Sequence, residues 1–229
     1  MNPERVQRII QERQGGNQTG LISILEEIQS QYSHLPEEAL KMVAAETGRS
    51  LVDVYGCGLL FTGSSAIGKS ETALDLVERG HRLVADDVVT ITRRHGDVLI
   101  GSGNQLLRHH MEIRGLGIID VQTVFGIRSI RLQKRVEVEV NLREWSSSED
   151  YERLGLDDRK STFLDIEIPL VQVPITPGKN ITVIAEVIAL NYLVKVYGGY
   201  SPAERLNQHL IELMKRKSAA RAWVREDTE

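Results

Sequence analysis

The eight residues from 63 to 70 read GSSAIGKS and match the pattern G-x-x-x-x-G-K-[ST] of a phosphate-binding loop. In such a loop, backbone N–H groups and the N-terminus of the following helix surround phosphate oxygens, and the glycines leave room for close approach. Lys69 can reach the outer phosphates and the Ser70 hydroxyl can ligate Mg²⁺, so charge is neutralised where phosphoryl transfer develops it. The residues whose backbone forms the loop are Gly63, Ser64, Ser65, Ala66, Ile67 and Gly68.

Two adjacent carboxylates, Asp86 and Asp87, follow the next predicted strand. A strand parallel to the first one ends at the same edge of the sheet as the loop, where ligands of open α/β sheets bind. One carboxylate can orient metal or water while the other accepts a hydroxyl proton, and the alternative is an acidic cap of the next segment. A further pair, Glu112 and Arg114 in HHMEIRGLGIID, is a weak signal by itself.

The elements that position these residues alternate between strand and helix. LLFT (59–62) is typical of a buried strand, SETALDLVER (70–79) of a helix that Gly80 ends, and RLVADD (82–87) of a second strand. This order predicts a right-handed crossover with both strands in one sheet, and hence an α/β fold.

The remaining sequence of this unit predicts further strands and helices. A hairpin should turn at residues 95–97, followed by one or two helical turns over 104–111 and a half-solvated strand over 136–142. The prolines of DIEIPLVQVPITPG (165–178) favour an extended segment near an edge of the sheet. Two helices follow, the first capped by Asn180 and the second opened by Ser201 and Pro202.

The N-terminal part has a different character. Residues 1–20 are predicted to be a flexible leader without chemistry. Apolar residues recur at helical spacing in LISILEEIQSQY (21–32), and Pro36 can begin a second helix that ends at Gly48. We therefore expect a small helical module over residues 1–50, either packed on the main domain or docking a partner, and a second domain over residues 51–229.

Composition narrows the classes of function. The chain of 229 residues has a formal charge of -4, which gives no overall attraction to nucleic acid or to an anionic membrane. Its one cysteine, Cys57, allows neither an internal disulfide nor a four-ligand zinc site, and is expected to be a small core residue. No segment is expected to reach the roughly 18 apolar residues of a membrane span, and no signal peptide is recognised, so a cytoplasmic protein is predicted.

Several longer motifs carry a resemblance to a known family. They are LVDVYG, FTGSSAIGKSETALDLVERGHRLVADD, MEIRGLGIIDVQTVFG, YERLGLD and VPITPGKN. In this order they closely resemble the C-terminal catalytic domain of HPr kinase/phosphorylase, over residues 51–215. The resemblance implies a P-loop kinase fold related to phosphoenolpyruvate carboxykinase, a hexamer, and an ATP- and Mg²⁺-dependent kinase for a serine of the phosphocarrier protein HPr. It also implies a reverse reaction, in which inorganic phosphate releases pyrophosphate.

The resemblance assigns roles by position. Asp87 takes the serine proton in the forward reaction and returns it in the reverse one, next to Asp86. Ser70 and Glu112 become Mg²⁺ ligands, and Lys69 contacts phosphate. The arginines assigned to catalysis are Arg114, in the motif that serves both directions, and Arg153 of YERLG.

Two further assignments concern the reverse reaction. The segment from Pro174 to Lys179 is associated with dephosphorylation. The family carries a catalytic histidine at the place that Gly48 occupies here.

The N-terminal helices do not resemble that family. ISILEEIQSQYSHLPEEALKMVAAETGRSLVDVYG is similar to the start of the thioredoxin-like [2Fe–2S] subunit of NADH dehydrogenases and hydrogenases, but the cluster cysteines are missing, so no cluster is implied. The partner of residues 1–50 stays open. Two alternatives to an HPr kinase also stay open: a kinase of this fold for another protein or a small hydroxyl metabolite, and a nucleotide sensor without catalysis.

Overall fold

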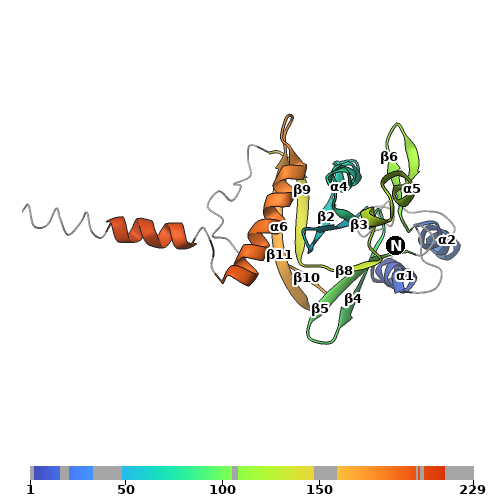
Figure 1. Cartoon of the computed structure of the whole chain (residues 1–229). Helices are drawn as coiled ribbons and strands as arrows, with labels where there is room; N and C mark the ends of the chain where they lie inside the picture. The colour runs from blue at the N-terminus through green and yellow to red at the C-terminus, as the bar shows by residue number, and fades with distance from the viewer. Residues whose placement is uncertain are drawn as a thin grey trace, which may run out of the picture.

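A mixed six-stranded sheet forms the centre of the chain (Figure 1). The structure is a computed structural model that describes residues 3–15, 21–32, 48–104, 108–146, 159–199, 201 and 204–214. In spatial order the strands are β10 (Lys160–Phe163), β11 (Ile166–Ile175), β9 (Val138–Glu144), β2 (Cys57–Gly63), β1 (Ser50–Val54) and β3 (Arg82–Ala85). Strands β11, β9 and β2 run parallel. β1 is antiparallel to both β2 and β3, so β3 is parallel to β2, as the sequence predicts, with an unpredicted strand between them.

Two helices cover one face of this sheet (Figure 1). They are α4 (Lys69–Glu78) and α6 (Ile181–Gly198), and their buried side chains share one apolar core with β2 and β9. Helix α4 ends as predicted at Gly80, whose φ of +95° suits a glycine. The α/β prediction and the strand–loop–helix–strand order are confirmed.

A smaller sheet covers part of the opposite face. It consists of β4 (Val89–Arg94), β5 (Val98–Gly103) and β8 (Gln133–Arg135), and the predicted hairpin turn at residues 95–97 joins β4 to β5. Leu60 and Val84 of the large sheet pack there against Leu99. The proline-rich strand β11 lies one position from the edge, with β10 outside it, which agrees with its prediction.

The segment after the small sheet forms a second hairpin. It pairs β6 (His110–Ile113) with β7 (Gly117–Asp120), and α5 (Val121–Phe125) and the 3₁₀ turn η1 (Ile127–Ser129) follow. The predicted helical turns over 104–111 are wrong for His110 and Met111, and residues 105–107 lie outside the described part of the chain. Met111 is fully buried opposite Ile119, and this strand pairing outweighs the local helical tendency.

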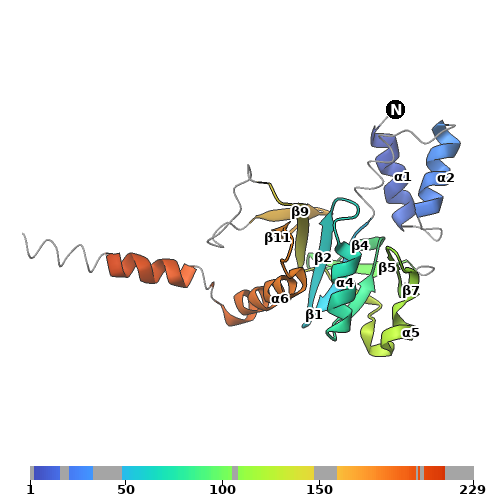
Figure 2. The ribbon, with the colours of Figure 1, turned by 90° about the horizontal axis from the view of Figure 1, so that it is seen from above.

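The N-terminal prediction needs one correction. Helix α1 (Pro3–Gly15) occupies most of the segment expected to be a flexible leader, because Val6, Ile9 and Ile10 form a buried apolar stripe at helical spacing. Helix α2 (Leu21–Tyr32) is confirmed and lies beside α1 (Figure 2). The helix predicted from Pro36 falls outside the described residues.

Helix α6 qualifies by length and composition as a membrane span, with a mean hydropathy of 1.5 over 18 residues. The expectation that no segment is this apolar is therefore wrong. The helix packs on β2, β9 and α4, and its Glu186 pairs with Arg79 at the end of α4. The predicted cap is present, since the Asn180 side chain accepts a hydrogen bond from the Val183 N–H at 3.1 Å. A further helix over residues 204–214 points away from the sheet in Figure 1.

Candidate active site

The carboxyl ends of the parallel strands meet at one edge of the large sheet. β2 ends there in the phosphate-binding loop, and β3 ends in Asp86 and Asp87. β9 and β11 end at the same edge, so the segment from Pro174 to Lys179 lies there as well. Lys179 Nζ donates a hydrogen bond to the Pro174 carbonyl at 2.9 Å.

The loop has the backbone that its glycines predict. A Cβ on Gly63 would lie 2.3 Å from the Leu142 carbonyl oxygen, so only glycine fits. Gly68 caps α4 with a φ of +103° and places no side chain on the first-turn N–H groups. Those N–H groups and the positive end of the helix dipole face the position where phosphate oxygens bind in such loops.

Lys69 folds back onto the loop. Its Nζ donates to the Gly63 carbonyl at 2.9 Å and to the Ser64 carbonyl at 2.6 Å, and the residue is only 6% exposed. Burial lowers the pKa of Lys69, while the nearby Asp86 and Asp87 oppose this shift. The ammonium is therefore close to both carboxylates as well as to the loop.

Asp86 is a buried carboxylate at the end of β3. It is 7% exposed, and its Oδ1 accepts hydrogen bonds from the Ser70 hydroxyl, at 3.1 Å, and from the Ser50 hydroxyl. Burial raises the pKa of Asp86 to about 6, although both hydrogen bonds act in the opposite direction. Asp86 thus connects strand β1 to the predicted metal ligand Ser70.

Asp87 adopts an unusual backbone conformation. Its φ of +65° lies in the left-handed region, which for a residue other than glycine costs on the order of 1 kcal/mol. The N–H groups of Gly48 and Arg49 donate to the Asp87 carbonyl at 2.6 and 3.1 Å and hold this turn. Burial, followed by the Glu112 carboxylate, raises the pKa of Asp87, and Lys69 lowers it.

Glu112 therefore lies near Asp87, and both it and Arg114 are exposed on the β6–β7 hairpin. No group of three or more acidic, histidine or cysteine side chains in the described ranges could hold a metal ion unaided. Mg²⁺ in a phosphate-loop site needs less from the protein, since phosphates and water complete its octahedron. The Ser70 hydroxyl and one carboxylate fit this requirement with hard oxygen atoms.

Gly48 lies beside these groups. A Cβ built on it would be 3.9 Å from Lys69 Nζ and 4.0 Å from Asp87 Oδ1, which are ordinary contact distances. Position 48 therefore borders the site, as the resemblance implies, but carries no side chain there.

His81 lies elsewhere. It follows α4, whose 10 residues span about 15 Å from the loop. Its Nε2 is 3.1 Å from Glu186 Oε1, and its ring meets Tyr55 edge to face. Glu186 also accepts two hydrogen bonds from Arg79, at 2.8 and 2.7 Å, and these lower the pKa of Glu186 to about 2. His81 thus joins α4 to α6 and does not serve the site.

Arg153 falls outside the described residues, so its predicted role stays a prediction. Sequence reasoning missed two contributors, Ser50 and the backbone of Gly48 and Arg49. No motif marks a strand serine as the partner of an aspartate 36 residues away, or a backbone N–H as the partner of the next aspartate.

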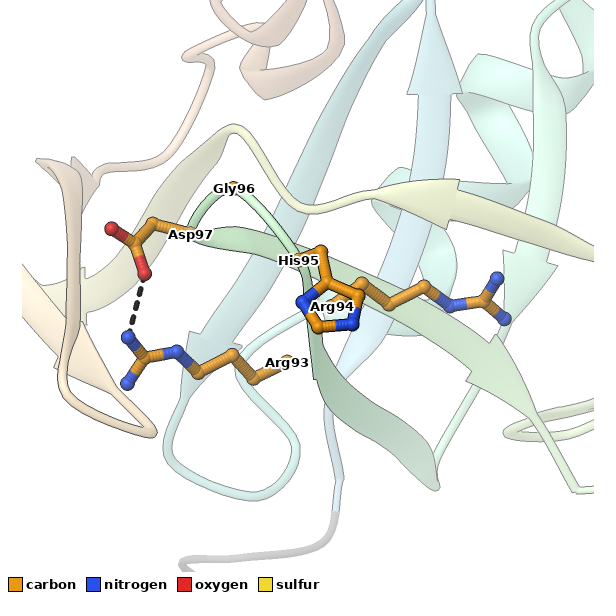
Figure 3. Close-up of a pocket in the computed structure, with 5 residues that line it drawn as sticks. All are labelled: Arg93, Arg94, His95, Gly96 and Asp97. Atoms are coloured by element: carbon orange, nitrogen blue, oxygen red, sulfur yellow. Dashed lines mark hydrogen bonds and ion pairs between the residues drawn. The ribbon is translucent and has the colours of Figure 1, made fainter.

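A hollow of about 500 Å³ lies at the β4–β5 turn, and Figure 3 shows the residues that line it. It is lined by Arg93, Arg94, His95, Gly96 and Asp97, and an ion pair of 2.6 Å joins Arg93 to Asp97. None of the candidate active-site residues at the carboxyl ends of β2 and β3 lines this hollow.

Comparison with known proteins identifies the family. The family model of the HPr serine kinase C-terminal domain matches residues 41–210. The chain belongs to this family. The HPr kinase/phosphorylase of Prosthecochloris aestuarii is 56% identical over 185 residues, covering 79% of this chain and 54% of that protein. The HPr kinase/phosphorylase of Chloroherpeton thalassium is 61% identical over 161 residues, covering 70% and 47%.

A solved structure of this family gives the same fold. It is the HPr(Ser) kinase/phosphatase of Coxiella burnetii, with a TM-score of 0.61 and 30% identity over 71% of this chain and 96% of that one. The chain spans about half the length of the curated HPr kinases that it matches. A second family model, the thioredoxin-like [2Fe-2S] ferredoxin, matches residues 6–62, which confirms the resemblance of the N-terminal helices.

Proposed function

We propose that the protein is an ATP- and Mg²⁺-dependent kinase that phosphorylates a serine of HPr. One observation carries the proposal: Asp87, in a left-handed turn held by two N–H groups, adjoins Lys69 and Glu112 at the edge where the phosphate-binding loop opens. A carboxylate in this place can reach a hydroxyl that approaches the outer phosphate. Family membership supports this assignment.

Each residue has a defined task in the forward reaction. Lys69 turns from the loop carbonyls to the outer phosphates, where its charge balances the oxygens of the transferred group. Asp87 accepts the proton of the acceptor serine hydroxyl as that oxygen forms its bond to phosphorus and the bond to the ADP oxygen breaks. Ser70 and Glu112 would hold Mg²⁺, which would supply positive charge to neutralise the phosphate oxygens.

The reverse reaction would use the same groups. An oxygen of inorganic phosphate forms a bond to the phosphorus of phosphoserine, which gives pyrophosphate, while the bond to the serine oxygen breaks and Asp87 returns its proton to that oxygen. Two anions must then meet, so positive donors are needed around them. With glycine at position 48, we propose that the kinase activity is retained and the phosphorylase activity is weak.

We propose that the chain forms a homo-oligomer in the cytoplasm. The resemblance implies a hexamer. Support comes from apolar side chains on the outer face of α6, where Val187 is 57% and Leu190 is 47% exposed. The helix over residues 204–214 is exposed throughout, including Leu206 and Leu210. A helix this short is marginal in water without a packing partner.

A second acceptor is favoured by one observation. The ferredoxin-like match over residues 6–62 means that α1 and α2 differ from the HPr kinase family, so this chain could be directed to a protein other than HPr. Nucleic acid and membrane partners are not proposed.

The test is phosphotransfer from labelled ATP to purified HPr and, separately, to a cell lysate. Labelling of HPr that requires Mg²⁺ and disappears in Asp87→Asn supports the proposal. Labelling of a different lysate protein with HPr unlabelled selects the second acceptor. Tight ATP binding without any labelling refutes a kinase and favours a nucleotide sensor.

A further inference from the structure

Ser50 is the first residue of β1 and is 1% exposed. Its neighbours along the strand, Leu51 and Val52, are fully buried apolar residues. Its hydroxyl donates to Asp86 Oδ1, the same oxygen that accepts from the Ser70 hydroxyl. A buried hydroxyl therefore contacts the carboxylate that adjoins the phosphate-binding loop.

The geometry of the shared oxygen has a chemical consequence. A serine hydroxyl has one proton and two lone pairs, so when Ser70 donates its proton to Asp86 its lone pairs are free for a metal ion. The direction of those lone pairs depends on where Asp86 Oδ1 lies. Ser50 belongs to a central strand paired with β2 and β3, so it fixes that oxygen to the rigid sheet.

We propose that Ser50 is a positioning residue for phosphoryl transfer: its hydroxyl holds the Asp86 carboxylate so that Ser70 presents its oxygen to the Mg²⁺ ion of the bound nucleotide. Ser50 touches neither nucleotide nor acceptor, and acts through Asp86 and Ser70. The inference rests on the proposed Mg²⁺-nucleotide site but not on the identity of the acceptor.

A purely structural role makes a different prediction. If Ser50 only satisfied a buried carboxylate, its loss would lower stability and would weaken nucleotide binding equally with and without metal. A positioning role weakens only the part of binding that Mg²⁺ adds. Loss of a group that orients a metal ligand typically costs 10- to 100-fold in metal affinity or activity.

The test is calorimetric binding of AMP-PNP to the full chain, once with EDTA and once with Mg²⁺. The variants are Ser50→Ala, which removes the hydroxyl, and Ser50→Thr, which keeps it. A matched control is Ser129→Ala, which removes another buried hydroxyl, one that donates to the Gly126 carbonyl at 2.6 Å. Thermal melting establishes that each variant is folded.

We expect Ser50→Ala to bind AMP-PNP in EDTA with unchanged affinity. The gain in affinity that Mg²⁺ produces should be about tenfold smaller than in the unsubstituted chain. Ser50→Thr should retain at least half of that gain, and Ser129→Ala all of it. An unchanged gain in folded Ser50→Ala overturns the inference, as does an equal loss with and without metal. If the unsubstituted chain shows no gain from Mg²⁺, the proposed function fails instead.

Discussion

A histidine at position 48 should raise the phosphorylase activity. The resemblance places a catalytic histidine of the family there, and the structure leaves room for it. A Cβ on Gly48 lies 3.9 Å from Lys69 Nζ and 4.0 Å from Asp87 Oδ1, without a clash. The imidazole of Gly48→His would therefore lie in the immediate neighbourhood of the two groups that we propose to bind phosphate and to accept the proton.

Two effects set the size of the change. The backbone at Gly48 has a φ of +70°, which costs a residue with a side chain about 1 kcal/mol, and histidine is among the residues that tolerate this region best. This cost lowers the stability of the fold but leaves the activation barrier of the proposed reaction in the folded chain unchanged. One added donor to the charge that develops between phosphate and phosphoserine is worth about 10²-fold in rate, or about 2.7 kcal/mol.

The assay measures pyrophosphate released from the phosphorylated acceptor in the presence of Mg²⁺ and inorganic phosphate. Gly48→His should release it about 10²-fold faster than the unsubstituted chain. Gly48→Ala is the control, because it carries the backbone cost without the donor, and it should stay slow. Rapid release by the unsubstituted chain would refute the reasoning, and so would an equal acceleration in Gly48→Ala.

Four other outcomes are expected. Asp87→Asn should abolish phosphotransfer but keep Mg-ATP affinity within about tenfold in calorimetry, whereas Lys69→Ala should weaken both. The pKa of Asp86 is about 6 in the fold and 3.8 ordinarily, so between these pH values the folded chain keeps a proton that the unfolded chain releases. The stability gained by Asp86→Asn, measured by thermal melting, should therefore grow from pH 4 to 6 and level off above. Glu186→Gln should lower the free energy of unfolding by about 2 kcal/mol with kcat unchanged, because its contacts lie at the far end of α4. A chain beginning at residue 51 should stay soluble but phosphorylate at least about tenfold more slowly than one beginning at 48, since it lacks the hydrogen bonds to both aspartates.

The phosphate-binding loop and the two acids could be predicted because the residues that define them are close together in the sequence. A strand, the loop pattern and a helix with a terminal glycine are adjacent in the chain, and two acids after the next strand must lie at the same edge. The sequence did not predict helix α1, because its three apolar residues stand between charged and polar ones, as they can in a polar leader. The surface that buries them is not visible in the local sequence.

Strand β1 was missed for a different reason. It joins β2 through Tyr55 and Gly56, whose φ angles of +53° and +87° are both positive, as in the tightest hairpin turns. Asparagine or aspartate usually marks the first position of such a turn, and tyrosine does not. The tyrosine gains an edge-to-face contact with His81 at 4.6 Å, which no local pattern reveals. The pair of Ser50 and Asp86 could not be predicted either, because its two residues are far apart in the chain and no local pattern connects them.

The hydrogen bonds from residues 48–50 to Asp86 and Asp87 limit how this chain can be joined to other domains. Two of them come from backbone N–H groups, which every residue except proline has, so they depend on the path of the chain more than on the side chains. A designer who exchanges the N-terminal helices for another module must therefore make the junction before Gly48. A shorter graft would keep the sheet and the loop but release both aspartates. Residues 48–50 thus form both the start of the sheet and the contacts to Asp86 and Asp87, so a change in the backbone path at these residues displaces both carboxylates.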